Sequence, residues 1–211
     1  WKYYKKEKVE NMRLIRMTDD PILKPIEKHN WEKGAVFNAG AVYHNNQFHM
    51  IYRATDLGGN EKYGPYINSL GYAASKNLIH WERKAEPILK NGVPQELRGP
   101  EDPRIVELEG KFYMTYTGFG NRFQDDFRIC LASSNDLIHW ERHGVVLDEP
   151  NKNASLFPEK IEGRYCMFHR RHPDIWICFS DDLERWVDHK KVMLPIPNSW
   201  NQTRIGIAGP P

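Results

Sequence analysis

The string Glu-Asp-Pro-Arg, which begins at Glu101, places two carboxyl groups next to each other in this chain of 211 residues. Successive side chains of a strand point to opposite faces, so only one carboxylate can share a face with Arg104. A carboxyl group in an apolar, aromatic channel has its ionised form disfavoured, which suits a general acid near neutral pH. We take Asp102 and Glu101 as candidates, although a surface turn held by ion pairs is the commoner explanation of the string alone.

Several basic residues form the second group whose side chains could take part in chemistry. Arginine side chains bind phosphate oxygens in pairs, and several cations together offset the cost of desolvating a doubly charged anion. Each cation taken alone is best explained as a solvated surface charge. If they lie on matching strands of repeated units, they could surround one oxyanion: Arg53, Lys152, Arg170 and Arg204.

A repeated unit indicates how these side chains are positioned. Three segments share a pattern of an apolar strand, Ser, a polar pair, Leu and Trp, and then another strand: 72–89, 131–148 and 177–194. Two strand-like segments precede each copy. The nearer ones follow a turn and are rich in aromatic and β-branched residues: 47–55, 111–119 and 164–171. The farther ones are 36–43, 101–107 and 154–161.

Four strands that repeat about every 50 residues are typical of a β-propeller blade. The expected class is therefore all-β, with the first strand of each blade lining a central channel. A β-sandwich with coincidental repeats is the alternative. Residues 198–210 resemble the first strand of a fourth blade, and three blades and a fragment do not close into a ring. We expect a C-terminally truncated propeller, or a partner that completes it, over residues 12–211, preceded by an extension at residues 1–11.

Composition narrows the class of partner. The chain is 40% hydrophobic, 12% aromatic and 27% charged, and 30 basic against 28 acidic residues give a net charge of +2. This balance gives no reason to expect nucleic acid or a membrane surface as partner, and no apolar run is long enough to span a bilayer. Three cysteines without a Cys-x-x-Cys pair, and no secretory leader, favour a reducing, cytoplasmic compartment.

The histidines near residue 170 raise the question of a metal. His169 and His172 are three residues apart, and on a strand this spacing sends them to opposite faces. No third ligand is evident in the sequence. We therefore expect no metal ion and no cofactor.

Five strings together resemble the mannoside phosphorylases of glycoside hydrolase family 130. They occur in the family's order and cover nearly everything from Met12 to Pro211: FNAGAVYHNNQFHMIYRA, GPEDPRI, NKNASLFPEKIEGRYCMFHR, IWICFSDDLERW and RIGIAGPP. The resemblance implies a five-bladed β-propeller, of which this chain holds about three blades and the start of a fourth. It is closest to the branch that acts on β-1,4-mannosides.

The resemblance also implies a role for each candidate. Asp102 matches the family's proton donor. Asn38 and Arg53 would bind the mannose of the cleaved sugar, and we expect Arg104 beside them. Lys152, Arg170 and Arg204 would bind phosphate. Two places depart from the family pattern, the triplet Asn151-Lys152-Asn153 and Arg204, and both keep a cation in the site, Lys152 and Arg204.

The implied reaction is an inverting phosphorolysis of β-1,4-mannosides that yields α-mannose 1-phosphate and a shortened acceptor sugar. The protein would be a glycosyltransferase-type glycoside phosphorylase, with inorganic phosphate as co-substrate and a mannose-containing oligosaccharide as partner. The acceptor sugar and association into a homo-oligomer stay open. One alternative is a β-mannosidase of the same family, whose members lack the cation cluster. Another is a carbohydrate-binding propeller without catalysis.

Overall fold

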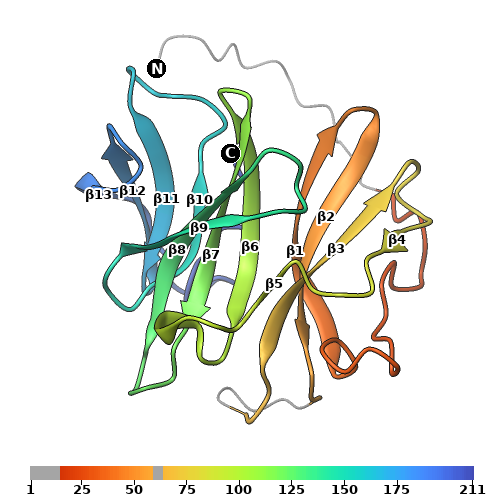
Figure 1. The fold of residues 1–211 in the computed structure, drawn as a ribbon. Helices are drawn as coiled ribbons and strands as arrows, with labels where there is room; N and C mark the ends of the chain where they lie inside the picture. Colours follow the sequence, from red (N-terminus) through yellow and green to blue (C-terminus); the bar gives the residue numbers. More distant parts are fainter. Residues whose placement is uncertain (1–14, 59–63) are drawn as a thin grey trace.

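A computed structural model describes residues 15–58 and 64–211, and it is built from antiparallel β-sheets (Figure 1). The first sheet has five strands: β1 (Ala35–His44), β2 (Gln47–Thr55), β3 (Asn68–Ser75), β4 (Glu82–Arg83) and β5 (Leu89–Lys90). The second has β6 (Pro100–Leu108), β7 (Lys111–Phe119), β8 (Phe127–Ser134) and β9 (Glu141–Leu147). The third has β10 (Lys152–Leu156), β11 (Tyr165–Arg171), β12 (Asp174–Ser180) and β13 (Val187–Met193). A 3₁₀ turn, Pro94–Glu96, precedes β6.

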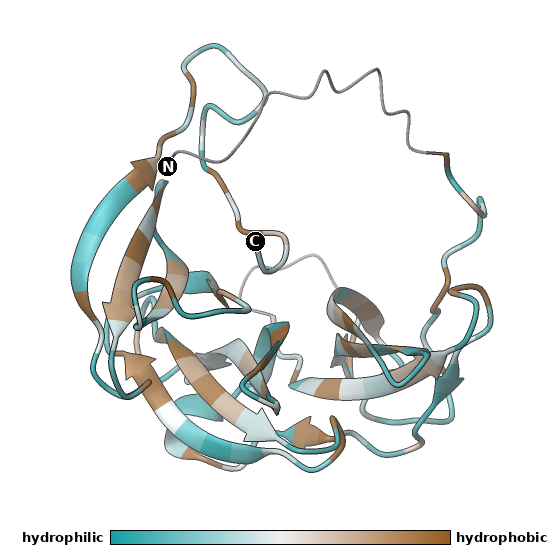
Figure 2. Ribbon diagram, turned by 90° about the horizontal axis from the view of Figure 1, so that it is seen from above, coloured by the Kyte–Doolittle hydropathy of each residue, from teal (hydrophilic) through white to brown (hydrophobic). Residues whose placement is uncertain are grey.

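Each sheet follows chain order, and the three sheets lie side by side along an arc when viewed from above (Figure 2). The first strands β1, β6 and β10 are neighbours, with β6 between the other two. This arrangement confirms the predicted repeat of strands. The third first strand is shorter than predicted and ends at Leu156, because Pro158 lacks the N–H group that a continued ladder requires. A closed ring and a count of five blades remain predictions.

The recurrent Ser…Leu…Trp pattern forms the corner between the third and fourth strands. In the third copy, the Ser180 hydroxyl accepts hydrogen bonds from the amides of Asp182 and Leu183 at 3.3 and 2.9 Å. Leu183 has a positive φ of 68°, and its carbonyl accepts the indole N–H of Trp186 at 3.2 Å. Both features recur at Leu78 and Leu137. The repeat is thus a local hydrogen-bonded turn.

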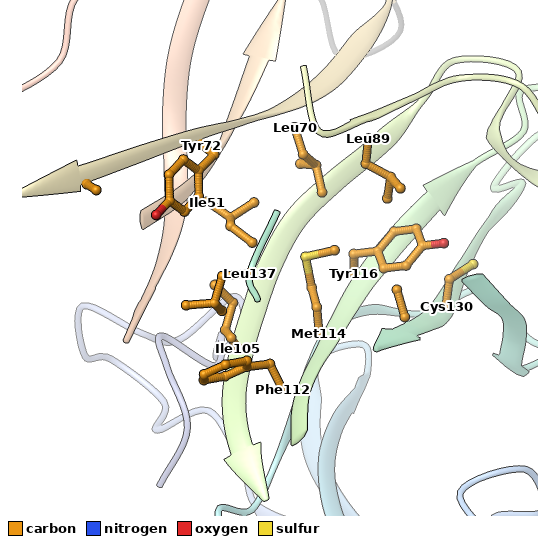
Figure 3. Packing of buried hydrophobic residues seen from close by; sticks show 12 residues of the cluster. Ile51, Leu70, Tyr72, Leu89, Ile105, Phe112, Met114, Tyr116, Cys130 and Leu137 are labelled. Carbon is orange, nitrogen blue, oxygen red and sulfur yellow. The ribbon is translucent and has the colours of Figure 1, made fainter. Parts of the chain in front are cut away.

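The hydrophobic core lies between the sheets. One cluster joins the first and second sheets, with Ile51 and Leu70 packed against Met114 and Leu137 (Figure 3). A second cluster joins the second and third sheets through residues such as Leu131 and Met167. Because each sheet buries its faces against its neighbours, the relative positions of the first strands are fixed.

Each first strand carries a β-bulge at the same place. The register shifts after Phe37, after Glu101 and after Lys152. The next residue has a positive φ in all three: 47° at Asn38, 51° at Asp102 and 60° at Asn153. Asn and Asp tolerate this left-handed conformation better than most residues, which explains why they occupy these positions. The bulges re-aim these side chains.

The predicted strand of a fourth blade is not formed. Residues 198–210 adopt turns and coil, because no neighbouring strand in the described chain offers them a hydrogen-bonded ladder. The segment instead turns toward the inside of the arc (Figure 2). The extension predicted at residues 1–11 lies outside the described residues. Among residues 15–58 and 64–211 there is no helix with the length and apolar character to cross a lipid bilayer.

Candidate active site

The three bulged strands and the C-terminal segment surround a pocket of about 820 Å³. Six of the seven residues predicted from the sequence line it: Asn38, Asp102, Arg104, Lys152, Arg170 and Arg204. The pocket therefore brings together residues that are up to 166 positions apart, counted from 38 to 204. Only Arg53 lies behind the lining, where it is 7% exposed and supports the carboxylates.

The two carboxylates share one guanidinium group. Arg53 donates from Nη1 to Oδ1 of Asp102 at 3.0 Å and from Nη2 to Oε1 of Glu101 at 2.8 Å. Only one of the two carboxylates, that of Asp102, lines the pocket together with Arg104, as the alternation of a strand predicts. The bulge after Glu101 nevertheless brings both carboxylates within reach of one guanidinium group. Asp102 lines the pocket, whereas Glu101 is buried beneath it.

The electrostatic surroundings of Asp102 differ from the expectation. Burial raises the pKa of this carboxyl, but attraction to Arg53, a hydrogen bond from Asn38 at 2.9 Å and the charge of Lys152 outweigh burial. The pKa of Asp102 is therefore held below its ordinary value. The predicted apolar, aromatic environment would have raised it. The difference arises because the repeat places cations on both neighbouring sheets.

Glu101 orders the basic side chains around it. It is 1% exposed, and its second oxygen accepts a hydrogen bond from Lys152 Nζ at 2.5 Å. Its first oxygen also accepts from the amide of Asn68 at 3.1 Å. Sequence reasoning considered Glu101 only as a rival of Asp102 and missed this bridging role, because the contacts join three different sheets. The only sequence signal was its place beside Asp102.

Three arginines line the pocket without a carboxylate partner within 4 Å among the described residues. Arg104 and Arg170 donate to backbone carbonyls of Ile207 and Ile205, at 3.2 and 3.5 Å. Burial lowers the pKa of both guanidinium groups, and the charge of Arg204 lowers that of Arg170 further. The charge of Asp102 offsets part of both shifts, but it does not form an ion pair with either arginine. Cations held close together without an ion-paired carboxylate form a site that favours a multiply charged anion.

The remaining lining includes residues that the sequence analysis did not select. Phe119 and Phe127 supply aromatic rings, with Lys152 Nζ at 5.7 and 5.2 Å from their centroids. Aromatic rings beside polar groups are suited to the apolar faces of sugars. Asp125 adds a further carboxylate to the lining, and Asn151 adds an amide. Asp125 lies in a turn and Asn151 directly precedes β10, so no periodic pattern of the sequence singles out either residue.

One histidine cluster lies behind the pocket rather than in it. His169 is fully buried, and its ligand atoms lie within 4.8 Å of those of Cys178 and His189. The two imidazoles are joined by a hydrogen bond of 2.9 Å, and the Cys178 thiol donates to the Met167 carbonyl. His172 lies in the turn after β11 and lines the pocket instead.

Side-by-side antiparallel sheets whose first strands converge on a polar pocket are the arrangement of propeller-type, sugar-binding enzymes. The comparison with known families agrees with this class. A family described as β-1,4-mannooligosaccharide phosphorylase matches residues 5–211. The chain therefore belongs to glycoside hydrolase family 130, the family of the mannoside phosphorylases, as the motifs of the sequence indicate.

Two relatives come from Thermoanaerobacter sp. (strain X514). A 1,2-β-oligomannan phosphorylase is 61% identical over 95% of this chain and 68% of its own length. A β-1,2-mannobiose phosphorylase is 51% identical over 94% of this chain and 68% of its own length. Among solved structures, a glycosyl hydrolase from Bacteroides ovatus has a TM-score of 0.82 at 25% identity and covers 92% of this chain and 64% of its own. The chain thus spans about two thirds of the length of these proteins.

Proposed function

We propose that this chain carries the catalytic pocket of a β-mannoside phosphorylase, which cleaves the glycosidic bond with inorganic phosphate. The observation that carries the proposal is the group of four pocket cations beside the carboxylate of Asp102: Arg104, Lys152, Arg170 and Arg204. The three arginines have no carboxylate within 4 Å among the described residues. A pocket for neutral sugar alone does not require this concentration of positive charge, whereas a pocket that also takes in an anionic reactant does.

The residue roles that we propose combine the family resemblance with the positions of the side chains in the pocket. Phosphate would bind Lys152, Arg170 and Arg204, and one of its oxygens would attack the anomeric carbon. Asp102 would supply the proton for the leaving oxygen from the opposite face of the sugar, which is the inverting arrangement with phosphate in place of activated water. No catalytic base is needed, because phosphate is already an anionic nucleophile. The products are α-mannose 1-phosphate and a shortened acceptor sugar.

The mannose would be held close to the donor carboxylate. Asn38 and Arg104 line the pocket on either side of Asp102, and Asn38 already donates a hydrogen bond to it. Arg53 would act through Asp102, which it orients, rather than by broad contact with the sugar. Phe119 and Phe127 would stack on the apolar face of a pyranose ring.

The linkage we propose is β-1,2. The motifs of the sequence favoured the β-1,4 branch, and the matching family carries that description. The two relatives above 50% identity, however, are named for β-1,2-linked substrates. Identity of 61% and 51% to two relatives named for β-1,2-linked substrates supports that linkage more strongly than the description of a whole family does. The β-1,4 assignment is therefore the second choice.

A hydrolase is the alternative of the same family. Asp125 lines the pocket together with Asp102, and a second carboxylate is what an inverting hydrolase uses to activate water. The cation group favours phosphate over water as the nucleophile. A carbohydrate-binding module without catalysis is the remaining alternative.

The experiment is product analysis with β-1,2-mannobiose and β-1,4-mannobiose, each with and without inorganic phosphate. We expect mannose 1-phosphate from the β-1,2 substrate only when phosphate is present. Mannose 1-phosphate from the β-1,4 substrate alone would reverse the linkage. Free mannose without phosphate would establish the hydrolase, and binding without turnover would establish the sugar-binding module.

A further inference from the structure

The residue opposite each bulge is held by a buried network, and the third sheet uses a different one. The pairing register places Tyr52, Tyr116 and His169 opposite the bulges of the first, second and third sheets. Tyr52 donates its hydroxyl to Glu32 at 2.9 Å, and Tyr116 donates to Glu96 at 2.7 Å. Both glutamates are almost fully buried. The first two sheets therefore use the same tyrosine–glutamate pair.

An arginine from the fourth strand completes each of these pairs. Arg83 binds Glu32 at 2.9 Å, and Arg142 binds Glu96 at 3.0 Å. Among residues 15–58 and 64–211, neither network makes a hydrogen bond or an ion pair with a cation of the pocket. Each network stabilises its own sheet without reaching the pocket.

In the third sheet the same place is taken by a histidine with a defined direction of hydrogen bonding. The Arg170 amide, which can only donate, bonds to Asn151 Oδ1 at 3.1 Å, and this fixes the orientation of the Asn151 amide. Asn151 Nδ2 then donates to His169 Nδ1 at 2.9 Å, and it also donates to Glu149 Oε1 at the surface of the sheet at 3.1 Å. Burial lowers the pKa of His169 to about 4, so its ring is neutral at pH 7. Nε2 therefore carries the proton and donates to His189 Nδ1 at 2.9 Å.

Asn151 is the point where this network meets the pocket. It is 1% exposed, it precedes Lys152 in the chain, and it accepts the backbone N–H group of Arg170. Lys152 and Arg170 are themselves partners in the register of β10 and β11. One side chain, held from behind by His169, therefore fixes the backbone of two pocket cations at once.

We propose that His169 is a positioning residue for phosphate, which acts through Asn151 to hold Lys152 and Arg170 at the separation that the anion requires. The inference rests on the proposed function. In this sheet the tyrosine–glutamate pair of the first two sheets is replaced by a histidine whose two ring nitrogens face Asn151 and His189. The imidazole supplies an acceptor toward the pocket and a donor toward the sheet's outer strand.

The test compares phosphate binding by titration calorimetry in the wild-type chain and in matched variants. His169→Leu keeps most of the volume and removes the acceptor, whereas His169→Asn keeps an acceptor near the position of Nδ1. We expect His169→Leu to weaken phosphate binding by about tenfold, the loss of roughly one buried hydrogen bond, and His169→Asn to recover most of it. We expect the affinity for β-1,2-mannobiose to change by less than about twofold. A variant that only damages the fold would instead weaken the binding of both ligands.

Tyr116→Phe is the control, since it removes the equivalent hydrogen bond in a sheet whose network does not touch the cations. We expect it to lower thermal stability and leave phosphate binding unchanged. Equal phosphate binding by wild type and His169→Leu, or equal losses in His169→Leu and Tyr116→Phe, would overturn the inference alone. A wild-type chain that binds mannobiose but no phosphate would overturn the proposed function and the inference with it.

A measurement on the wild-type chain does not depend on how the variants fold. Nitrogen-15 NMR of labelled histidine distinguishes the two neutral tautomers. We expect the His169 ring to carry its proton on Nε2 at pH 7. A proton on Nδ1 would face the Asn151 amide donor and would overturn the inference.

Discussion

Asp102 is the residue in which most of the proposed chemistry resides, and its neighbours hold it in its ionised form. Arg53 and Asn38 both donate to the same oxygen, Oδ1, at 3.0 and 2.9 Å. In the proposed reaction the other oxygen, Oδ2, would face the substrate. A proton donor must be protonated when the bond breaks, so the reaction needs a change in the charge around this carboxyl.

Replacement of Asp102 by Asn should remove phosphorolysis while the fold survives. Asn keeps the shape and can still accept from Arg53, but it has no acidic proton to give. We expect the rate of mannose 1-phosphate formation to fall on the order of 10³-fold. Asp148→Asn is the matched control, because Asp148 is 90% exposed and pairs only with Arg128 outside the pocket. Retention of most activity by Asp102→Asn would exclude it as the donor.

Phosphate binding should raise the pKa of Asp102 and so favour its protonated form. The charges of Arg53 and Lys152 hold the pKa of Asp102 down, and a phosphate dianion beside the pocket cations would offset them and raise it. Between the lowered and the raised pKa, binding therefore takes up protons. Calorimetry at pH 6 in two buffers of different ionisation enthalpy measures this uptake. Phosphate loses a proton of its own when it binds as the dianion at this pH, and this contribution is common to both proteins. We expect the wild type to take up more protons, or release fewer, than Asp102→Asn, and equal values would contradict the coupling.

The element that places these residues is the bulged first strand, repeated three times. Asn38, Asp102 and Asn153 occupy the same position of β1, β6 and β10, each with a positive φ. One backbone geometry thus serves three different side chains: the amide of Asn38, which donates to Asp102, the proposed donor Asp102, and the amide of Asn153 beside the proposed phosphate cations. A left-handed conformation of this kind persists where the surrounding sheet determines it.

Close approach between β1 and β6 is required for this arrangement. A Cβ atom added at Gly40 would meet the Pro103 carbonyl oxygen at 2.7 Å, directly after Asp102. We expect Gly40→Ala to lower the free energy of unfolding in urea by about 1–3 kcal/mol and to reduce phosphorolysis, because the displaced strand moves Asp102. At Gly209 an added Cβ meets nothing within 4 Å, so Gly209→Ala is the control. An effect of similar size at both positions would argue against this close contact.

At the scale of the whole molecule, the pocket depends on the packing between sheets rather than within them. The clusters that join the first sheet to the second, and the second to the third, hold β1, β6 and β10 next to each other. Lys152 of the third sheet then reaches Glu101 of the second, which also binds Arg53 of the first. One buried carboxylate therefore links all three sheets.

A loss of packing between the sheets should lower the stability of the whole chain. Met114 is fully buried between the first and second sheets. We expect Met114→Ala to lower the free energy of unfolding by about 2–5 kcal/mol, through lost burial and a residual cavity. Met193, which is 53% exposed, supplies the matched control, and its replacement by Ala should cost far less. A loss below about 1 kcal/mol at Met114 would show that the sheets are not held together there.

Much of the fold could be predicted because the repeat is local. The nearer strands begin and end at or within one residue of the predicted bounds, since aromatic and β-branched runs bounded by turns are decided by neighbours in the chain. The Ser…Leu…Trp corner is likewise a set of contacts within seven residues. The strand predicted at residues 198–210 did not form, because a strand depends on a partner as well as on its own sequence.

For the site, the sequence by itself determined which residue types were available and that the repeat would bring them to one place. Six of the seven predicted residues line the pocket for that reason. Only the tertiary structure decided the charge state of Asp102, the bridging role of Glu101 and the link from His169 to the cations. Each of these depends on side chains from different sheets, and electrostatic and hydrogen-bond energies fall off over distances that only the packed fold defines.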